Sequence, residues 1–91
     1  MTDDRKRAAV RRLERAVLLR EMARSTYYHY QGASGGYARR MARRLLQAAD
    51  TAVREAVITG RADGLSRGEM AGIIGVSVSR IADVLKAPAG S

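Results

Sequence analysis

The chain has 91 residues, a formal net charge of +8 and no cysteine. This length indicates a single small domain, and the lack of cysteine excludes disulfides, thiolate chemistry and zinc fingers. Alanine, arginine and leucine are abundant while Phe and Trp are absent, so we expect an all-α fold. The apolar runs are too short for a membrane span and the N-terminus lacks the apolar segment of a secretory signal, so the expected location is the cytoplasm.

The positive charge is concentrated in one half of the sequence. Residues 1–45 hold twelve lysines and arginines against four acids, whereas residues 46–91 hold five of each. A net charge of this size favours a polyanionic partner, so we expect part of the basic half to contact phosphates. The alternative interpretation is that these arginines only keep a long helix in solution.

The first helix is expected to begin at Thr2 or Asp3, where acidic residues complement the positive end of the helix dipole. Leu18 and Met22 lie nearly opposite its main apolar face, which predicts a second packing surface that a second subunit would cover. Arg20 falls inside the main face, so its head must reach solvent or pair with an acid. The main face recurs at helical spacing: Ala9, Leu13, Ala16, Val17, Ala23 and Tyr27.

Residues 25–30 are rich in aromatic and β-branched side chains, but no partner strand is evident nearby, so we expect the helix to continue through them. The three tyrosines of this segment are expected to pack in the core or a dimer interface, with stacking on nucleic-acid bases as the alternative. His29 has no companion residues for a metal site. Residues 31–36 indicate a flexible connection.

A second amphipathic helix is predicted from Tyr37 to about Thr59, ending at Gly60 as its C-cap and followed by a linker over residues 61–64. Its many alanines permit close approach of a neighbouring helix. The predicted apolar face comprises Met41, Leu45, Ala48, Ala49, Ala52, Val53 and Ala56.

Two arginine pairs lie early in this helix: Arg39, Arg40, Arg43 and Arg44. Like charges four residues apart repel by roughly a few tenths of a kcal/mol, so a bound polyanion or acids of a second subunit explain them better than helix stability does. A second basic cluster at residues 5–12 would form an arm along a groove. A solvated face is the alternative for both clusters.

Residues 66–85 have the pattern of two short helices joined by a tight turn. Ser66 and Glu69 are spaced as a capping box, and Ser77 can cap the second helix. Gly75 falls at the turn, where a positive φ is required.

Small and apolar side chains are expected to fill the space between these two helices. Ala71 lies where the helices must cross closely, and Val76 is expected to plug the turn. The apolar stripes are Met70 and Ile74 on the first helix and Ile81, Val84 and Leu85 on the second.

This segment resembles the helix-turn-helix family of bacterial and phage DNA-binding proteins. The resemblance covers about the last quarter of the chain and implies that the second helix enters the major groove and reads base edges near its N-terminus. Gly68 and Gly72 depart from the family pattern and weaken the first helix by roughly 1 kcal/mol each relative to alanine. The matching residues are Ala71, Gly75, Val76, Ser77, Ile81 and Val84.

We interpret residues 1–91 as one domain, with a basic two-helix region at 1–60 that dimerises, a helix-turn-helix at 65–87 and a flexible tail at 88–91. The side chains of the second helix expected to face outward are Val78, Ser79, Ala82, Asp83 and Lys86. Base contacts are expected from Val78, Ser79, Arg80 and Asp83, with a phosphate as the alternative partner of Arg80. Phosphate contacts are expected from Ser66, Arg67, Ser77, Lys86, Arg39, Arg40, Arg43 and Arg44.

The function expected from these residues is sequence-specific binding of double-stranded DNA by a small homodimeric transcriptional regulator in the bacterial cytoplasm or nucleoid. No catalytic constellation is recognisable, so we expect no enzyme, no cofactor, no metal and no small-molecule ligand. Three alternatives stay open. They are an accessory DNA-binding protein of a plasmid or phage, a helical protein-interaction module without DNA binding, and a non-specific coat on DNA.

Overall fold

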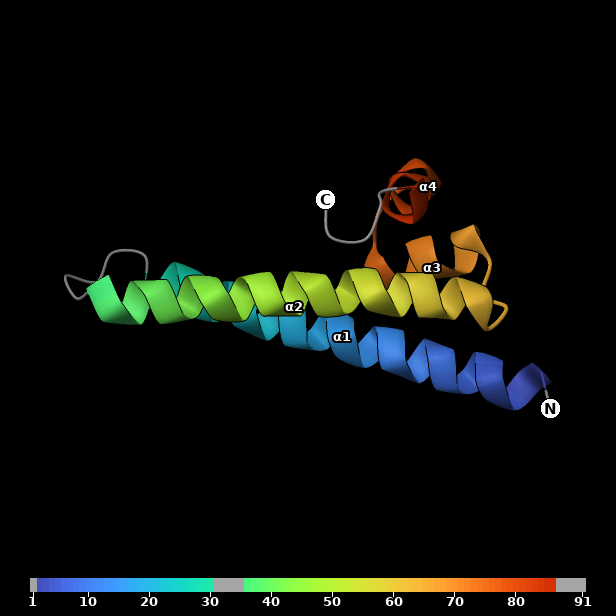
Figure 1. Cartoon of the computed structure of the whole chain (residues 1–91), viewed down its shortest axis with the longest axis horizontal. Coiled ribbons are helices and arrows are strands. Elements are labelled where there is room, and N and C mark those ends of the chain that lie inside the picture. The colour runs from blue at the N-terminus through green and yellow to red at the C-terminus, as the bar shows by residue number, and fades with distance from the viewer. Residues whose placement is uncertain (1, 31–35, 87–91) are drawn as a thin grey trace.

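The computed structural model describes residues 2–30 and 36–86, and these form four α-helices and no strand. The helices are α1 (Thr2–Tyr30), α2 (Gly36–Ala62), α3 (Arg67–Ile74) and α4 (Val78–Lys86). Figure 1 shows α1 and α2 as a long hairpin, with α3 and α4 at the end where α1 begins and α2 finishes. The expected all-α fold is confirmed, and so is the helical state of residues 25–30. Of the connection predicted at 31–36, residues 31–35 lie outside the described residues, whereas Gly36 is the first residue of α2; the tail at 88–91 also lies outside them.

The two long helices pack through small side chains. Ala16 and Ala23 of α1 are buried, as are Ala42 and Ala49 of α2. Short side chains let the two helix axes approach closely over much of the hairpin. The apolar face predicted for α1 is confirmed, since its alanines and its leucine are buried while Val17 and Tyr27 are half-buried.

The apolar face predicted for α2 is wrong over its N-terminal half. Met41, Leu45 and Ala48 are exposed, whereas Ala42 and Leu46 turn toward the interior. The physical reason is that the two helices approach closely through short side chains, Ala23 of α1 and Ala42 of α2, and this contact turns Met41 and Leu45 outward. Ala49, Val53 and Ala56 are buried as predicted, and Ala52 is half-buried.

The main apolar core lies at the end of the hairpin that carries α3 and α4. Its largest fully buried side chains come from all four helices and from the turn after α2: Leu13, Val57, Leu65, Met70 and Ile81. Burial of a side chain of this size contributes roughly 1.5–3 kcal/mol, so this cluster holds the two short helices against the hairpin. Within the described residues, no helix combines the length and the apolar character that crossing a membrane requires.

Gly60 does not end α2, contrary to the prediction. It is helical and buried, and a Cβ built on it would lie 3.0 Å from Leu65 Cδ1 and 3.4 Å from Met70 Sδ. The helix continues to Ala62, and the chain then turns at Gly64, whose φ of 103° lies in the left-handed region. The N–H of Leu65 then donates to the carbonyl of Gly60 at 2.9 Å, which closes the helix end. Gly60 is therefore a packing glycine.

Candidate nucleic-acid interface

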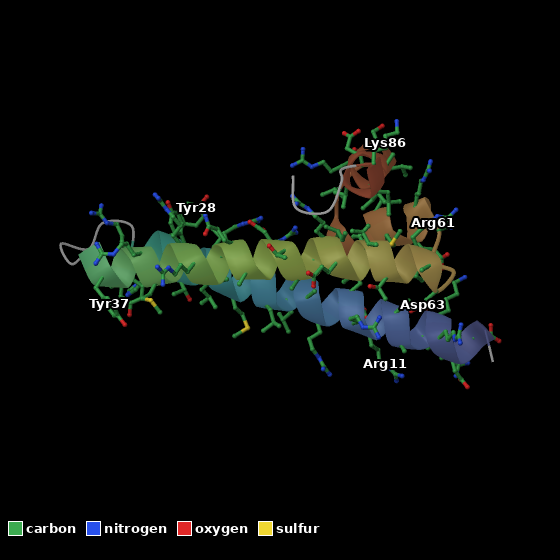
Figure 2. All side chains as sticks on the ribbon, viewed as in Figure 1. Arg11, Tyr28, Tyr37, Arg61, Asp63 and Lys86 are labelled. Carbon is green, nitrogen blue, oxygen red and sulfur yellow. The ribbon has the colours of Figure 1, made fainter. Side chains whose placement is uncertain are left out.

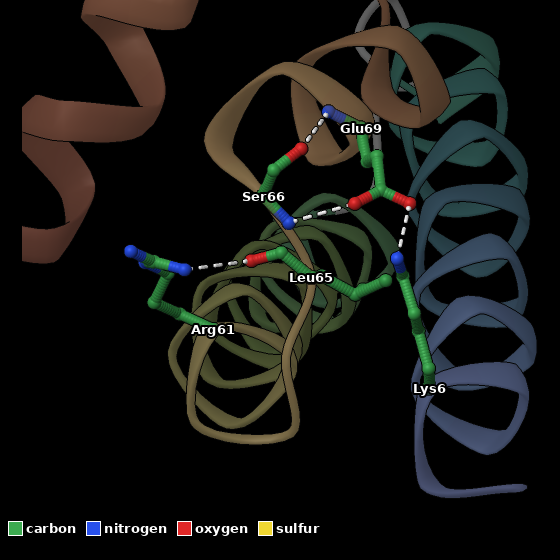
Figure 3. Close-up of polar contacts among 5 residues, drawn as sticks. All are labelled: Lys6, Arg61, Leu65, Ser66 and Glu69. Carbon is green, nitrogen blue, oxygen red and sulfur yellow. Dashed lines mark hydrogen bonds and ion pairs between the residues drawn. The ribbon is translucent and has the colours of Figure 1, made fainter. Parts of the chain in front are cut away.

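The N-terminus of α3 is closed by a capping box (Figure 3). Ser66 Oγ accepts a hydrogen bond from the backbone N–H of Glu69 at 3.0 Å, and the Ser66 N–H donates to Glu69 Oε1 at 3.0 Å. The other carboxylate oxygen of Glu69 lies 3.2 Å from Lys6 Nζ on α1. The backbone N–H of Ser66, followed by the Ser66 hydroxyl and the Lys6 ammonium, lowers the pKa of Glu69 below its ordinary value of 4.5.

This cap changes the role expected for Ser66. The Glu69 carboxylate occupies the positive end of α3, where a phosphate was expected, and the hydroxyl oxygen of Ser66 is engaged by the cap. Arg67 is exposed in the first turn and stays available for a phosphate. A second exposed arginine, Arg61, anchors the same turn, since its Nη1 donates to the Leu65 carbonyl at 3.2 Å.

The turn between α3 and α4 has the predicted chemistry. Gly75 adopts a left-handed conformation with φ 84° and ψ 33°, and its N–H donates to the Ala71 carbonyl at 2.8 Å. Ser77 Oγ accepts from the N–H of Arg80 at 3.2 Å and thereby caps α4. Val76 does not plug the turn as predicted, because it is 36% exposed and borders an open cleft. Ile81 is the side chain fully buried beneath α4.

The outward face predicted for α4 agrees with the structure except at Ala82, which is half-buried. Val78, Ser79 and Asp83 are exposed, and Lys86 is exposed at the C-terminal end of the helix. Figure 2 shows Lys86 on the side of α4 that faces away from the hairpin. The opposite face packs inward through Ile81, with Val84 and Leu85 half-buried.

Arg80 differs from the other predicted base-contact residues. It is exposed, but it lines a cleft between α4 and the hairpin, together with Arg20 of α1 and Arg54 of α2. Val78, Ser79 and Asp83 do not border this cleft. The structure therefore places Arg80 apart from Val78, Ser79 and Asp83, with which it was predicted to contact bases.

The arginines early in α2 lie far from α4. Arg39, Arg40 and Arg43 line a shallow depression beside Tyr27, and Arg44 lies outside it. All four are exposed. Figure 1 shows that α2 begins at the opposite end of the hairpin from α3 and α4, in a molecule 50 Å long. The predicted phosphate contacts thus fall into two separate groups.

The basic cluster at residues 5–12 is not a separate arm, as one interpretation had it. These residues belong to α1, and two of them form ion pairs with residues outside it. Lys6 pairs with Glu69, and Arg12 Nη1 lies 3.7 Å from Asp63 Oδ2 in the turn after α2. Both ion pairs are partly exposed, so each is weak on its own.

Sequence reasoning missed the arginines that share the cleft with Arg80, which are Arg20, Arg24 and Arg54. One signal was present, because Arg20 interrupts an apolar stripe and its environment was left open. Over residues 2–30 and 36–86 no three His, Cys, Asp or Glu side chains come close enough together to hold a metal ion. No protein family, curated protein or solved structure was found to match the chain.

Proposed function

We propose that the chain is a sequence-specific DNA-binding protein that acts as a small homodimeric transcriptional regulator. The observation that carries this proposal is the placement of α4. The helix is capped by Ser77 and fixed from below by the buried Ile81, and it presents Val78, Ser79 and Asp83 to solvent. A rigid helix with an exposed face of mixed apolar and polar side chains suits insertion into the major groove.

Each exposed side chain of α4 has a chemical match among base edges. The Val78 methyls suit the thymine methyl group, the Ser79 hydroxyl suits any base, and the Asp83 carboxylate accepts from the cytosine amine. An acid that faces DNA lowers affinity unless it reads a base, so Asp83 favours specific over non-specific binding. Arg67 and Lys86 would hold phosphates on either side of this face.

The arginines early in α2 would serve a different purpose. They lie too far from α4 to read the same few base pairs, so we assign them to phosphates farther along the duplex or to acids of a second subunit. Their contribution would be independent of sequence and sensitive to salt.

Dimerisation follows from the small reading surface and from exposed apolar residues on α1. A single helix of this size buries little surface, and such modules reach specific affinity by binding paired half-sites. Leu18 and Met22 are more than half exposed and lie on the side of α1 that faces away from the buried Ala9, Leu13 and Ala16. A second copy of the chain would cover them.

The experiment that tests this function is selection of bound duplexes from a random library with the full chain, followed by affinity measurements at several salt concentrations. We expect enrichment of an inverted repeat with half-sites about one helical turn apart. The affinity for it should fall linearly with log salt. Retention without enrichment would indicate a non-specific coat on DNA.

A second candidate is a helical protein-interaction module, which the exposed Leu18, Met22 and Leu45 favour. It predicts no retained duplex and little dependence on salt. The same selection therefore separates the two functions.

A further inference from the structure

An open cleft of about 660 Å³ lies at the inner corner between the C-terminal helix pair and the hairpin. Its walls come from α1, α2, α4, the last residue of α3 and the turn at Gly75 and Val76. Four arginines line it, Arg20, Arg24, Arg54 and Arg80, against two carboxylates, Glu21 and Asp50. The cleft is therefore net positive, and it lies between α4 and the two long helices.

The carboxylates leave most of this charge uncompensated. Glu21 Oε1 lies 3.3 Å from Arg24 Nη1, so one acid is engaged by one arginine of its own helix. Among the described residues, Asp50 lies within 4.0 Å of no cationic side chain, and Arg20, Arg54 and Arg80 lie within that distance of no carboxylate. The like charges around this cleft repel one another, and a bound anion would reduce that repulsion.

A buried polar group of Arg20 also points to an anionic ligand. Its Nε atom is buried and has no hydrogen-bond partner among the described residues. A buried donor without an acceptor costs about 1–3 kcal/mol, so such a group calls for an explanation. An oxyanion in the cleft would accept from the guanidinium groups that line it, in the planar geometry that arginine offers to phosphate and carboxylate, and a rotation of the Arg20 side chain would let its Nε–H join them.

Part of the cleft lining is apolar. Val76 is exposed and Ile74 and Val84 are half-buried, so these three side chains offer apolar surface, whereas Val53, Val57 and Ile81 beneath them are buried in the core. A cleft of this volume falls in the range of small-molecule sites, about 300–1,000 Å³, and this one combines some apolar surface with several polar side chains. These features suit a ligand with one anionic group and an apolar body.

We propose that this cleft binds a small organic anion, with its phosphate or carboxylate held by Arg20, Arg54 and Arg80 and its apolar body against Ile74, Val76 and Val84. The ligand would connect α4 to both long helices and engage Arg80, which then cannot contact DNA. This last consequence rests on the proposed function, whereas the binding itself does not.

The experiment is a titration of the ¹⁵N-labelled full chain with phenyl phosphate, followed through the arginine Nε–H signals. We expect saturable shifts of the Arg20, Arg54 and Arg80 signals. Phenol, which carries the ring without the charge, should not produce them. Arg20→Gln and Arg80→Gln should each weaken binding about tenfold, the effect of losing one hydrogen bond to a charged group. Arg44→Gln, which alters an exposed arginine outside the cleft, is the matched control.

Two outcomes would overturn the proposal. One is the absence of saturable shifts at millimolar phenyl phosphate, and the other is equal binding by Arg20→Gln and Arg44→Gln when both retain the helical circular dichroism of the wild type. A titration with random duplex DNA separates the other source of phosphate. If duplex but not phenyl phosphate moves the Arg20 signal, the cleft holds the DNA backbone instead. If the chain binds phenyl phosphate but no DNA, the proposed anion site is supported and the proposed DNA-binding function is contradicted.

Discussion

Glu69 stabilises the C-terminal helix pair through several polar contacts. Its carboxylate accepts from the Ser66 N–H, faces Lys6 of α1 and lies at the positive end of α3. One side chain thus completes a local cap and joins α3 to a helix distant in sequence. The reciprocal contact, from the Glu69 N–H to Ser66 Oγ, can be removed separately.

Replacement of Ser66 by alanine should destabilise the fold. The variant loses the acceptor for the Glu69 N–H, and loss of a helix cap of this kind costs about 1 kcal/mol. Urea denaturation of wild type and variant measures the difference. Ser79→Ala, which removes an exposed serine hydroxyl from the outward face of α4, should change stability little. Equal effects of the two substitutions would contradict the cap.

The pH dependence of stability should report the Glu69 carboxylate. Because the pKa of Glu69 is lowered in the folded state, the folded chain binds fewer protons than the unfolded chain near that pKa. The stabilisation is therefore present above the ordinary value of 4.5 and is lost as the pH falls through the lowered pKa. Glu69→Gln should be less stable than wild type at neutral pH and equal to it in strong acid.

The control for this measurement is Glu55→Gln, which changes an exposed glutamate of α2 that forms no ion pair with a described residue. It should leave the pH profile of unfolding near that of the wild type. A difference between wild type and Glu69→Gln that persisted unchanged into strong acid would assign the effect to side-chain shape instead of charge.

At the scale of elements, two glycines in helices make opposite predictions. A Cβ at Gly60 would press on Leu65 and Met70, whereas one at Gly72 on α3 meets nothing within 4 Å. Gly72→Ala should stabilise the fold by up to about 1 kcal/mol through helix propensity. Gly60→Val should destabilise it, by about 1–3 kcal/mol, through overpacking. Thermal denaturation that ranked the two variants in the reverse order would show that the contact of α2 with the turn at Leu65 is wrong.

Local chemistry explains why the helix pair was predictable and the buried face of the N-terminal half of α2 was not. The caps at Ser66 and Ser77 and the positive φ at Gly75 depend on neighbouring residues, so their pattern in the sequence is sufficient. The side of α2 that faces α1 depends on the partner helix. Met41 and Leu45 were predicted to be core residues, but the two helices pack through their alanines, and Met41 and Leu45 are exposed.

The same distinction applies to the candidate site. The outward register of Val78, Ser79 and Asp83 follows from where α4 begins, so it was predictable. The cleft at Arg80 depends on residues 20, 54 and 80 meeting in space, and no periodicity brings such distant positions together. The burial of Leu65 was missed for a related reason, because a residue between two helices belongs to no periodic apolar pattern.

At the scale of the whole molecule, the two ends of the hairpin differ in character. One end carries the apolar core and the C-terminal helix pair, and the other is held by alanine contacts and lined by arginines. Exposed Leu18 and Met22 lie on α1 between these ends. A surface of this kind is expected to associate.

The dimer prediction can be checked by sedimentation equilibrium. The wild-type chain should be a dimer at micromolar concentration, and the double variant Leu18→Asp/Met22→Asp should be a monomer because two charges would have to be buried at the interface. Both positions are more than half exposed, so the fold should be kept. Ile58→Asp on α2, also at an exposed apolar residue, should remain dimeric. A monomeric wild type would contradict the proposed dimer.

The most direct test of the central claim, that the outward face of α4 reads bases, is a comparison of selected duplex sequences. The selection from a random library is run with wild type, Asp83→Ala and Glu55→Ala, the last altering an exposed acid on α2. Asp83→Ala should lose preference at one position of each half-site, since a single base contact is worth about 1–3 kcal/mol, while Glu55→Ala keeps the wild-type consensus. An unchanged consensus for Asp83→Ala, or no consensus for the wild type, would contradict the claim.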